Sequence, residues 1–181
     1  MKKMVFYFLT GIAFVSCNST GTESKEAMKD STATPSASTT TVMNYPYTID
    51  HPDNWDMGST SNTMTALSAL KAYQDGNVPE SMKYFGDSVQ IQFDGMDKKM
   101  AADSLTAMFT NWRKGMKTID IKMSDWESVI SKDKKGEWVT IWYRQKWEDM
   151  KGKKDSLDVI DDMQIKDGKI VRLDEYSRKL H

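Results

Sequence analysis

Cysteine and histidine are almost absent from this sequence. A single cysteine, Cys17, occurs in 181 residues, so no disulfide can form within the chain. The two histidines, His51 and His181, lie outside every segment with regular periodicity. Because thiols and imidazoles are so few, we expect no metal site and no cofactor. The sequence also lacks a G-x-S-x-G element and a glycine-rich phosphate loop.

An excess of one charge is also missing. The 25 basic and 26 acidic residues give a formal net charge of -1, and no basic tail stands out. Nucleic acid is therefore not an expected partner. Two lysine-rich stretches, 132–135 and 151–154, contain aspartate or glycine and are typical of solvated hairpin tips.

No apolar run is long enough to span a bilayer as a helix. Lys2 and Lys3 precede an apolar stretch, 4–14, of about a dozen residues, whereas a spanning helix takes about 20. The following Val15-Ser16-Cys17 resembles the lipobox of bacterial lipoproteins. That resemblance implies cleavage before Cys17, a palmitate-type lipid on its sulfur and a membrane anchor. The expected location is the cell envelope, at the outer membrane, with the folded domain in the periplasm or at the cell surface.

Composition divides the chain into four parts. Residues 1–16 are the expected signal peptide, and residues 17–43, rich in serine, threonine and alanine, are expected to form a disordered tether. Residues 44–58 have aromatics but no regular period, which favours an extended arm whose Tyr47, Ile49 and Trp55 pack on the domain. Residues 59–181 form the expected folded domain.

Helical spacing occurs in three places. Apolar residues recur through 64–73, with Asn62 as the expected N-cap and Gly76 after the helix end. Pro79 is expected to open a short helix that carries Met82 and Phe85 and ends at Gly86. A third helix is indicated by Leu105, Met108, Phe109 and Trp112, with Gly115 at its end.

Alternation of apolar and polar residues predicts strands elsewhere. One strand covers 89–94, before the third helix, and four more cover 119–130, 138–147, 157–165 and 170–176. Asp167-Gly168 is a typical tight turn between the last two. The fold class is therefore α+β, with helices on one face of a curved antiparallel sheet.

Two segments resemble the nuclear transport factor 2-like superfamily, which includes the SnoaL-like and ketosteroid isomerase-like domains. The first is Leu67-Ser68-Ala69-Leu70-Lys71-Ala72-Tyr73-Gln74-Asp75-Gly76-Asn77 with the following Tyr84-Phe85-Gly86-Asp87-Ser88-Val89, and the second is Asp161-Asp162-Met163-Gln164-Ile165-Lys166-Asp167-Gly168-Lys169-Ile170. The resemblance implies a cone-shaped sheet with three N-terminal helices on its concave face and an apolar pocket inside. It implies no single activity.

Asp161 is the expected catalytic candidate. It matches the aspartate of the SnoaL-like hairpin motif, and alternation places it on one face with Val159 and Met163. An apolar pocket would tune such a carboxyl to act as a general base. The alternatives are that a bulge turns it outward, or that Arg144 or Tyr176 satisfies it. Asp94 is a second candidate, although its alternation favours an outward position.

Aromatic and thioether side chains supply the expected binding residues. They are Phe93, Trp112, Trp142, Met163 and Tyr176. The alternative is that the aromatics belong to the core or to a dimer interface. The strand 138–147 is apolar on both faces, which predicts that a second subunit covers the outer one and that the protein is a homodimer.

Function is expected to be binding rather than catalysis. The leading hypothesis is a lipid-anchored domain that binds a small apolar or carbonyl-containing ligand, or a partner, without catalysing a reaction. The alternative is a SnoaL-like enzyme of isomerase, cyclase or dehydratase type that uses Asp161. A third hypothesis is a structural subunit of an envelope assembly.

Overall fold

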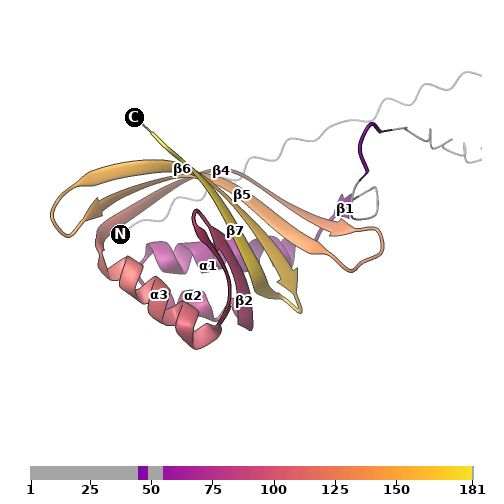
Figure 1. The fold of residues 1–181 in the computed structure, drawn as a ribbon, viewed down its shortest axis with the longest axis horizontal. Coiled ribbons are helices and arrows are strands. Elements are labelled where there is room, and N and C mark those ends of the chain that lie inside the picture. Colours follow the sequence, from indigo (N-terminus) through magenta and orange to yellow (C-terminus); the bar gives the residue numbers. More distant parts are fainter. Residues whose placement is uncertain (1–44, 49–54, 181) are drawn as a thin grey trace, which may run out of the picture. The chain divides into compact units, whose positions relative to one another are not determined.

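The computed structural model describes residues 45–48 and 55–180, which belong to one compact unit. Three helices lie on one side of a bent sheet (Figure 1). The signal peptide, Cys17, the tether and Ile49 fall outside the described residues. No helix within the described ranges is both long and apolar enough to cross a membrane.

The first two helices begin at side-chain caps, and glycines follow the first and the third. Helix α1 (Thr60–Gln74) starts after Ser59, whose hydroxyl accepts a hydrogen bond from the Ser61 amide. Gly76, with φ of 84°, follows its end, as predicted for a glycine in the left-handed region. Helix α2 (Val78–Met82) is capped by the Asn77 side chain, and α3 (Ala102–Lys114) ends at Gly115.

Within the described residues, the sheet contains seven strands in the order β1-β4-β5-β6-β7-β2-β3. Every neighbouring pair is antiparallel except β2 and β7, which run parallel. The described strands are β1 (Trp55–Met57), β2 (Phe85–Phe93), β3 (Met96–Ala101), β4 (Met116–Ser131), β5 (Glu137–Asp149), β6 (Lys154–Lys166) and β7 (Lys169–Lys179). This α+β architecture and its four consecutive antiparallel strands confirm the prediction.

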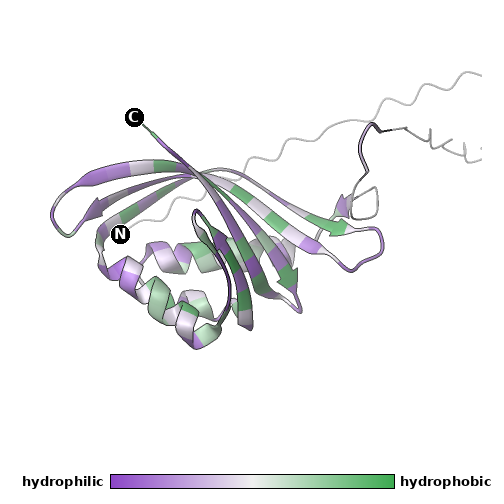
Figure 2. Ribbon diagram, in the orientation of Figure 1, coloured by the Kyte–Doolittle hydropathy of each residue, from purple (hydrophilic) through white to green (hydrophobic). Residues whose placement is uncertain are grey.

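The core lies between the three helices and the inner face of the sheet. Hydrophobic and hydrophilic residues alternate along the long strands, so each strand has an inner and an outer face (Figure 2). The inner face supplies fully buried Ile91, Val139, Ile141 and Ile170, while α3 contributes Leu105. Irregular register at Met123/Asp125 in β4 and in the β2–β7 pair helps to bend the sheet around this core.

Several local expectations were wrong. Ser59 caps α1, and Asn62 is instead buried in the first turn, where its amide donates to Glu137 Oε2 at 2.7 Å. Phe85 begins β2 rather than ending the second helix. Tyr47 is 85% exposed, so it does not pack on the domain.

The arm and the edge strands also differ from expectation. The expected arm continues into β1, where Trp55 pairs with Ser131 at the edge of β4. Strand β3 pairs with β2 as a second edge strand. Its sequence has no alternation of apolar and polar residues that would have predicted it. These two short strands are the ones that sequence periodicity did not reveal.

Candidate functional site

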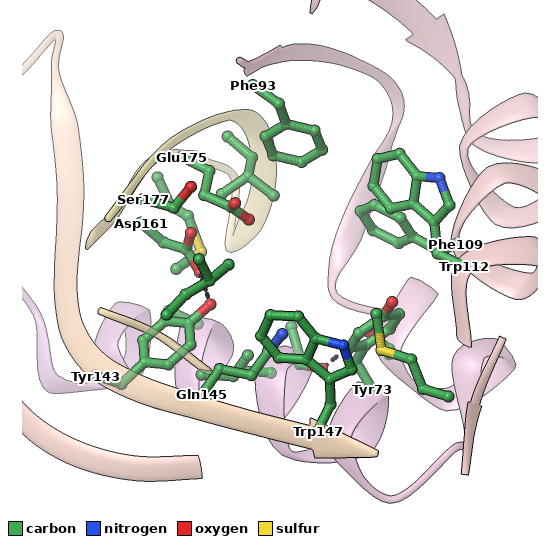
Figure 3. Close-up of a pocket in the computed structure, with 18 of the residues that line it drawn as sticks. Tyr73, Phe93, Phe109, Trp112, Tyr143, Gln145, Trp147, Asp161, Glu175 and Ser177 are labelled. Atoms are coloured by element: carbon green, nitrogen blue, oxygen red, sulfur yellow. Dashed lines mark hydrogen bonds between the residues drawn. The ribbon is translucent and has the colours of Figure 1, made fainter. Parts of the chain in front are cut away.

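A cavity of about 320 Å³ opens between the helices and the inner face of the sheet. That volume is at the lower end of the range for small-molecule pockets, which is roughly 300–1,000 Å³. The cavity is lined by residues of all three helices and by side chains from β2, β5, β6 and β7 (Figure 3). The lining is mainly apolar and aromatic, which suits a ligand with a hydrophobic body.

One wall of the cavity is a run of aromatic rings. The Tyr73 and Phe109 ring centroids are 5.6 Å apart, Phe109 and Trp112 are 5.9 Å apart, and Trp112 and Phe93 are 5.6 Å apart. Trp112 is 39% exposed, so this run reaches from the interior to solvent. Helical spacing on α3 places Phe109 and Trp112 on the same side.

The opposite wall carries two carboxyl groups on neighbouring strands. Asp161 of β6 and Glu175 of β7 are direct partners in the antiparallel register, so their side chains leave the sheet on the same face. Figure 3 shows both on the side of the cavity that faces Phe93 and Trp112. Asp161 is 5% exposed, which makes it one of the few buried charged residues.

Asp161 has only one of its two oxygens paired. The Tyr143 hydroxyl donates to Oδ2 at 2.9 Å, whereas Oδ1 accepts no hydrogen bond from any described residue. A buried oxygen of this kind costs stability unless it finds a donor. Since Asp161 lines the cavity, a ligand can supply that donor.

Burial holds protons on this pair of acids. Burial is the largest cause that raises the pKa of Asp161 well above its ordinary value, and the nearby Glu175 raises it further. The Tyr143 hydrogen bond lowers the pKa of Asp161 but does not offset these effects. Burial also raises the pKa of Glu175. The pair therefore retains a proton at pH values where a free aspartate has lost it.

The structure brings four of the predicted site residues together. Phe93, Trp112, Met163 and Asp161 all line the cavity, as expected. The placement of Trp142 and Tyr176 in the same pocket was wrong. Both lie on the outer face of the sheet, where Trp142, Ile160 and Tyr176 are successive partners across β5, β6 and β7.

Other expectations about the acids need correction. Asp94 follows β2 in the turn and lines the cavity, rather than pointing away from it. Arg144 does not satisfy Asp161, because it donates to Asp158 on the outer face. Tyr176 does not satisfy Asp161 either; the donor is Tyr143. The expectation that no metal site exists remains a prediction, although no cluster of metal-ligand type occurs among the described residues.

Two important residues were missed at the level of the sequence. Glu175 follows the inward Leu173 by two positions, so the same alternation that placed Asp161 could have placed Glu175. Tyr143 lies on a strand whose two faces are both apolar, so the sequence did not show which face is the inner one, and its register with Val159, two residues from Asp161, could not be read without the strand pairing. Both signals depend on knowing which strands are neighbours.

Comparison with solved structures shows the fold. AusH from Aspergillus nidulans superposes with a TM-score of 0.56 at 14% identity, covering 70% of this chain and 89% of that chain. A nuclear transport factor 2-like protein of unknown function from Burkholderia pseudomallei gives 0.55 at 12% identity, covering 66% and 92%. An LEH-like epoxide hydrolase from M. tuberculosis gives 0.53 at 14% identity, covering 66% and 84%.

These similarities establish a nuclear transport factor 2-like fold, as the sequence motifs implied. At such low identity they establish the fold alone, and one of the neighbours is an enzyme while another has no known function. No family model matches the sequence, and no curated protein matches it. Function therefore has to be argued from the cavity.

Proposed function

We propose that this domain binds a small, mainly apolar molecule in the cavity and holds its polar group with Asp161 and Glu175. The observation that carries this proposal is the buried Asp161 Oδ1, which has no donor among the described residues. An unpaired buried oxygen is a cost that a folded protein tolerates more readily when a ligand removes it. The aromatic wall supplies apolar contact area for the rest of such a ligand.

Binding of phenylbutanol to the purified protein tests this proposal. This probe combines an apolar aromatic body with one hydroxyl, which can donate to Asp161 Oδ1. Isothermal titration calorimetry should show saturable binding of one molecule per chain. The Ser177→Trp variant, which adds bulk at the cavity wall, should abolish it.

The neighbouring Tyr176→Trp variant is the matched control. It adds a similar ring on the outer face of the same strand and should bind phenylbutanol as the wild type does. Absence of saturable binding, or binding that survives Ser177→Trp, would refute a ligand site in this cavity.

A second candidate function is acid–base catalysis, and the raised pKa values favour it. A carboxyl pair whose pKa values are both raised by burial can both accept and return a proton, which proton transfer at carbon requires. In that case Asp161 is the general base. Exchange of the α-hydrogens of phenylbutanone in deuterated buffer, followed by NMR, tests it; wild type should accelerate exchange and Asp161→Asn should not.

We also propose that Cys17 carries a lipid and anchors the protein in the bacterial cell envelope. The order of two lysines, a short apolar run and Val15-Ser16-Cys17 supports this proposal. In that arrangement the binding domain is exposed to the periplasm or the cell surface, where small molecules from outside the cytoplasm are accessible. Cys17 itself lies outside the described residues.

A further inference from the structure

The cavity carries acidic side chains and no basic ones. Asp94, Asp161 and Glu175 are among its lining residues, whereas no lysine, arginine or histidine occurs among the described residues that line it. The tyrosines that face the acids, Tyr73 and Tyr143, have raised pKa values and remain neutral donors. Nothing in the described wall therefore neutralises a negative charge on the pair.

Two cationic side chains on elements around the cavity, Arg113 and Lys179, do not line it. Arg113 of α3 donates to the backbone carbonyls of Tyr73, Gln74 and Met116 at 3.1, 3.2 and 2.7 Å. Lys179 shares the inner face of β7 with Glu175 by alternation, but it is exposed and does not line the cavity. A carboxylate in this cavity therefore has no resident counter-ion within the described wall.

Aromatic rings face the acids across the cavity. Phe109 and Trp112 lie across the cavity from Asp161 and Glu175 in Figure 3, and Phe93 lies between the two sides. The negative face of an aromatic ring attracts a positive charge, and the attraction is stronger where the contact is desolvated. Both walls of the cavity are thus electrostatically suited to a cation and unsuited to an anion.

We propose that the ligand is an organic cation, with an ammonium group that donates to Asp161 Oδ1 and Glu175 and an apolar body that lies against Phe93, Phe109 and Trp112. This inference rests on the proposed ligand-binding function and names its ligand class. The ammonium group supplies the donor that Asp161 Oδ1 lacks. It also provides the counter-ion that the wall does not.

Proton release should accompany binding of the cation. The pair holds an extra proton in the free protein because burial raises the pKa of both carboxyls. An ammonium group beside them favours the ionised forms, so binding expels a proton and tightens as the pH rises. The other titratable groups that face the pair are Tyr73, Tyr143 and Asp94, and the two tyrosines stay protonated over this range.

A matched pair of probes tests the inference. Phenylbutylamine and phenylbutanol differ mainly in an ammonium in place of a hydroxyl group, and a primary amine of this type stays charged below about pH 10. Calorimetry at about pH 8 should show the amine binding at least about tenfold more tightly than the alcohol, which is about 1.4 kcal/mol. The preference should shrink at about pH 5, and titrations in phosphate and Tris should reveal proton release for the amine alone.

Three variants distinguish this inference from the proposed function. Asp161→Asn and Glu175→Gln should each lose the preference for the amine while still binding the alcohol. Asp162→Asn, next in the chain but on the outer face, should keep it. If the alcohol binds and the amine binds no more tightly, the organic cation is refuted and the ligand site stands. If neither probe binds, both proposals fail.

Discussion

Burial of the Asp161 carboxyl is unfavourable for folding, whereas the same carboxyl is suited to binding a ligand. Its strand position forces it into the interior, where Tyr143 pairs one oxygen and Glu175 adds a second acid. A buried acid with a raised pKa takes up protons on folding that the unfolded chain would release. Asp161 therefore does not destabilise the folded state below its ordinary pKa of 3.8. Its destabilising effect grows as the pH rises from there toward the raised pKa.

Asp161→Asn should consequently stabilise the protein at neutral pH. The amide keeps the shape and can still accept from Tyr143, but it removes the ionisable group. Urea unfolding should show a gain on the order of 1 kcal/mol for each unit by which folding raises the pKa of Asp161, and no gain at about pH 4. The stability of the variant should still depend on pH, but more weakly than that of the wild type, because burial also raises the pKa of Glu175.

Asp162→Asn provides the control, because Asp162 is half-buried on the other face and bonded to Thr140. A loss of about 1–3 kcal/mol of stability in Asp161→Asn at neutral pH would instead identify a structural acid, whose carboxyl accepts from Tyr143 more favourably than the amide does.

Residue-level prediction from the sequence succeeded where alternation alone decided the face. Phe93, Met163 and Asp161 lie in the cavity because their strands keep a two-residue period. Prediction failed for Trp142 and Tyr176, since aromatic character was used in place of alternation, and both follow the outward period. Glu175 was overlooked because an acid on an apolar face contradicts the usual hydrophobic pattern.

At the scale of elements, long periodic segments were predictable and short edge strands were not. Strands β4 to β7 each have 11 residues or more, so the two-residue period repeats many times. Strand β3 contains Asp97, Lys98 and Lys99, and its polarity reflects an exposed sheet edge rather than a loop. Strand β1 has only three residues.

The start of α1 shows how a local rule can select the wrong residue. Asn62 is a favoured N-cap type, but Ser59 occupies that position, and Asn62 instead joins the helix to the sheet through Glu137. The amide nitrogen lies 2.7 Å from Glu137 Oε2, and Asn62 is 5% exposed. That contact spans 75 residues of sequence, so no local pattern could have indicated it.

Asn62→Ala should therefore reduce the stability of the protein more than removal of the α1 N-cap does. We expect about 1–3 kcal/mol for Asn62→Ala, because a carboxylate loses a buried donor, compared with about 1 kcal/mol for Ser59→Ala. Chemical denaturation of each variant measures the difference. Glu137→Gln should reduce the additional cost of Asn62→Ala, and equal effects in both backgrounds would show that the contact contributes nothing.

At the scale of the whole chain, the first question is attachment to the membrane. If Cys17 is acylated, Cys17→Ala should shift the protein from the membrane fraction to the soluble fraction and should abolish labelling with a radioactive fatty acid. Ser16→Ala, beside it, is a control that leaves the thiol in place. Equal labelling of Cys17→Ala and wild type would disprove the lipid.

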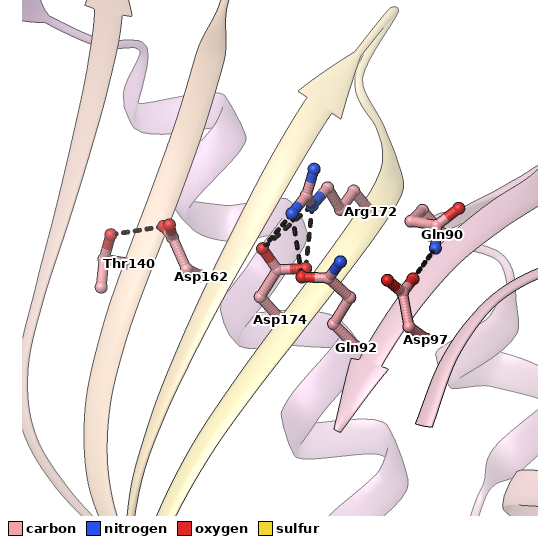
Figure 4. Close-up of polar contacts among 7 residues, drawn as sticks. All are labelled: Gln90, Gln92, Asp97, Thr140, Asp162, Arg172 and Asp174. Atoms are coloured by element: carbon pink, nitrogen blue, oxygen red, sulfur yellow. Dashed lines mark hydrogen bonds and ion pairs between the residues drawn. The ribbon is translucent and has the colours of Figure 1, made fainter. Parts of the chain in front are cut away.

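The outer face of the sheet raises the second question, which is assembly. Trp142, Ile160 and Tyr176 form a row across three strands, and Ile160 and Tyr176 are 37% and 62% exposed. Polar groups beside this row are already paired within the chain, including Thr140 with Asp162 and Arg172 with Asp174 (Figure 4). On its other side Arg144 and Arg178 both bond Asp158.

A second copy can cover this apolar row while the hydrogen bonds and ion pairs beside it stay intact, so we predict a symmetric homodimer. Sedimentation at micromolar concentration should give twice the mass of one chain. The interface of such a dimer should bury at least about 1,000 Å² in total. Ile160→Lys places a charge at the centre of the row and should yield monomers. Met57→Lys, at an exposed edge-strand position, should leave the dimer intact. A wild-type monomer at every concentration would refute the dimer, and the exposed Tyr45 and Tyr47 show that these arm residues do not cover the outer face in its place.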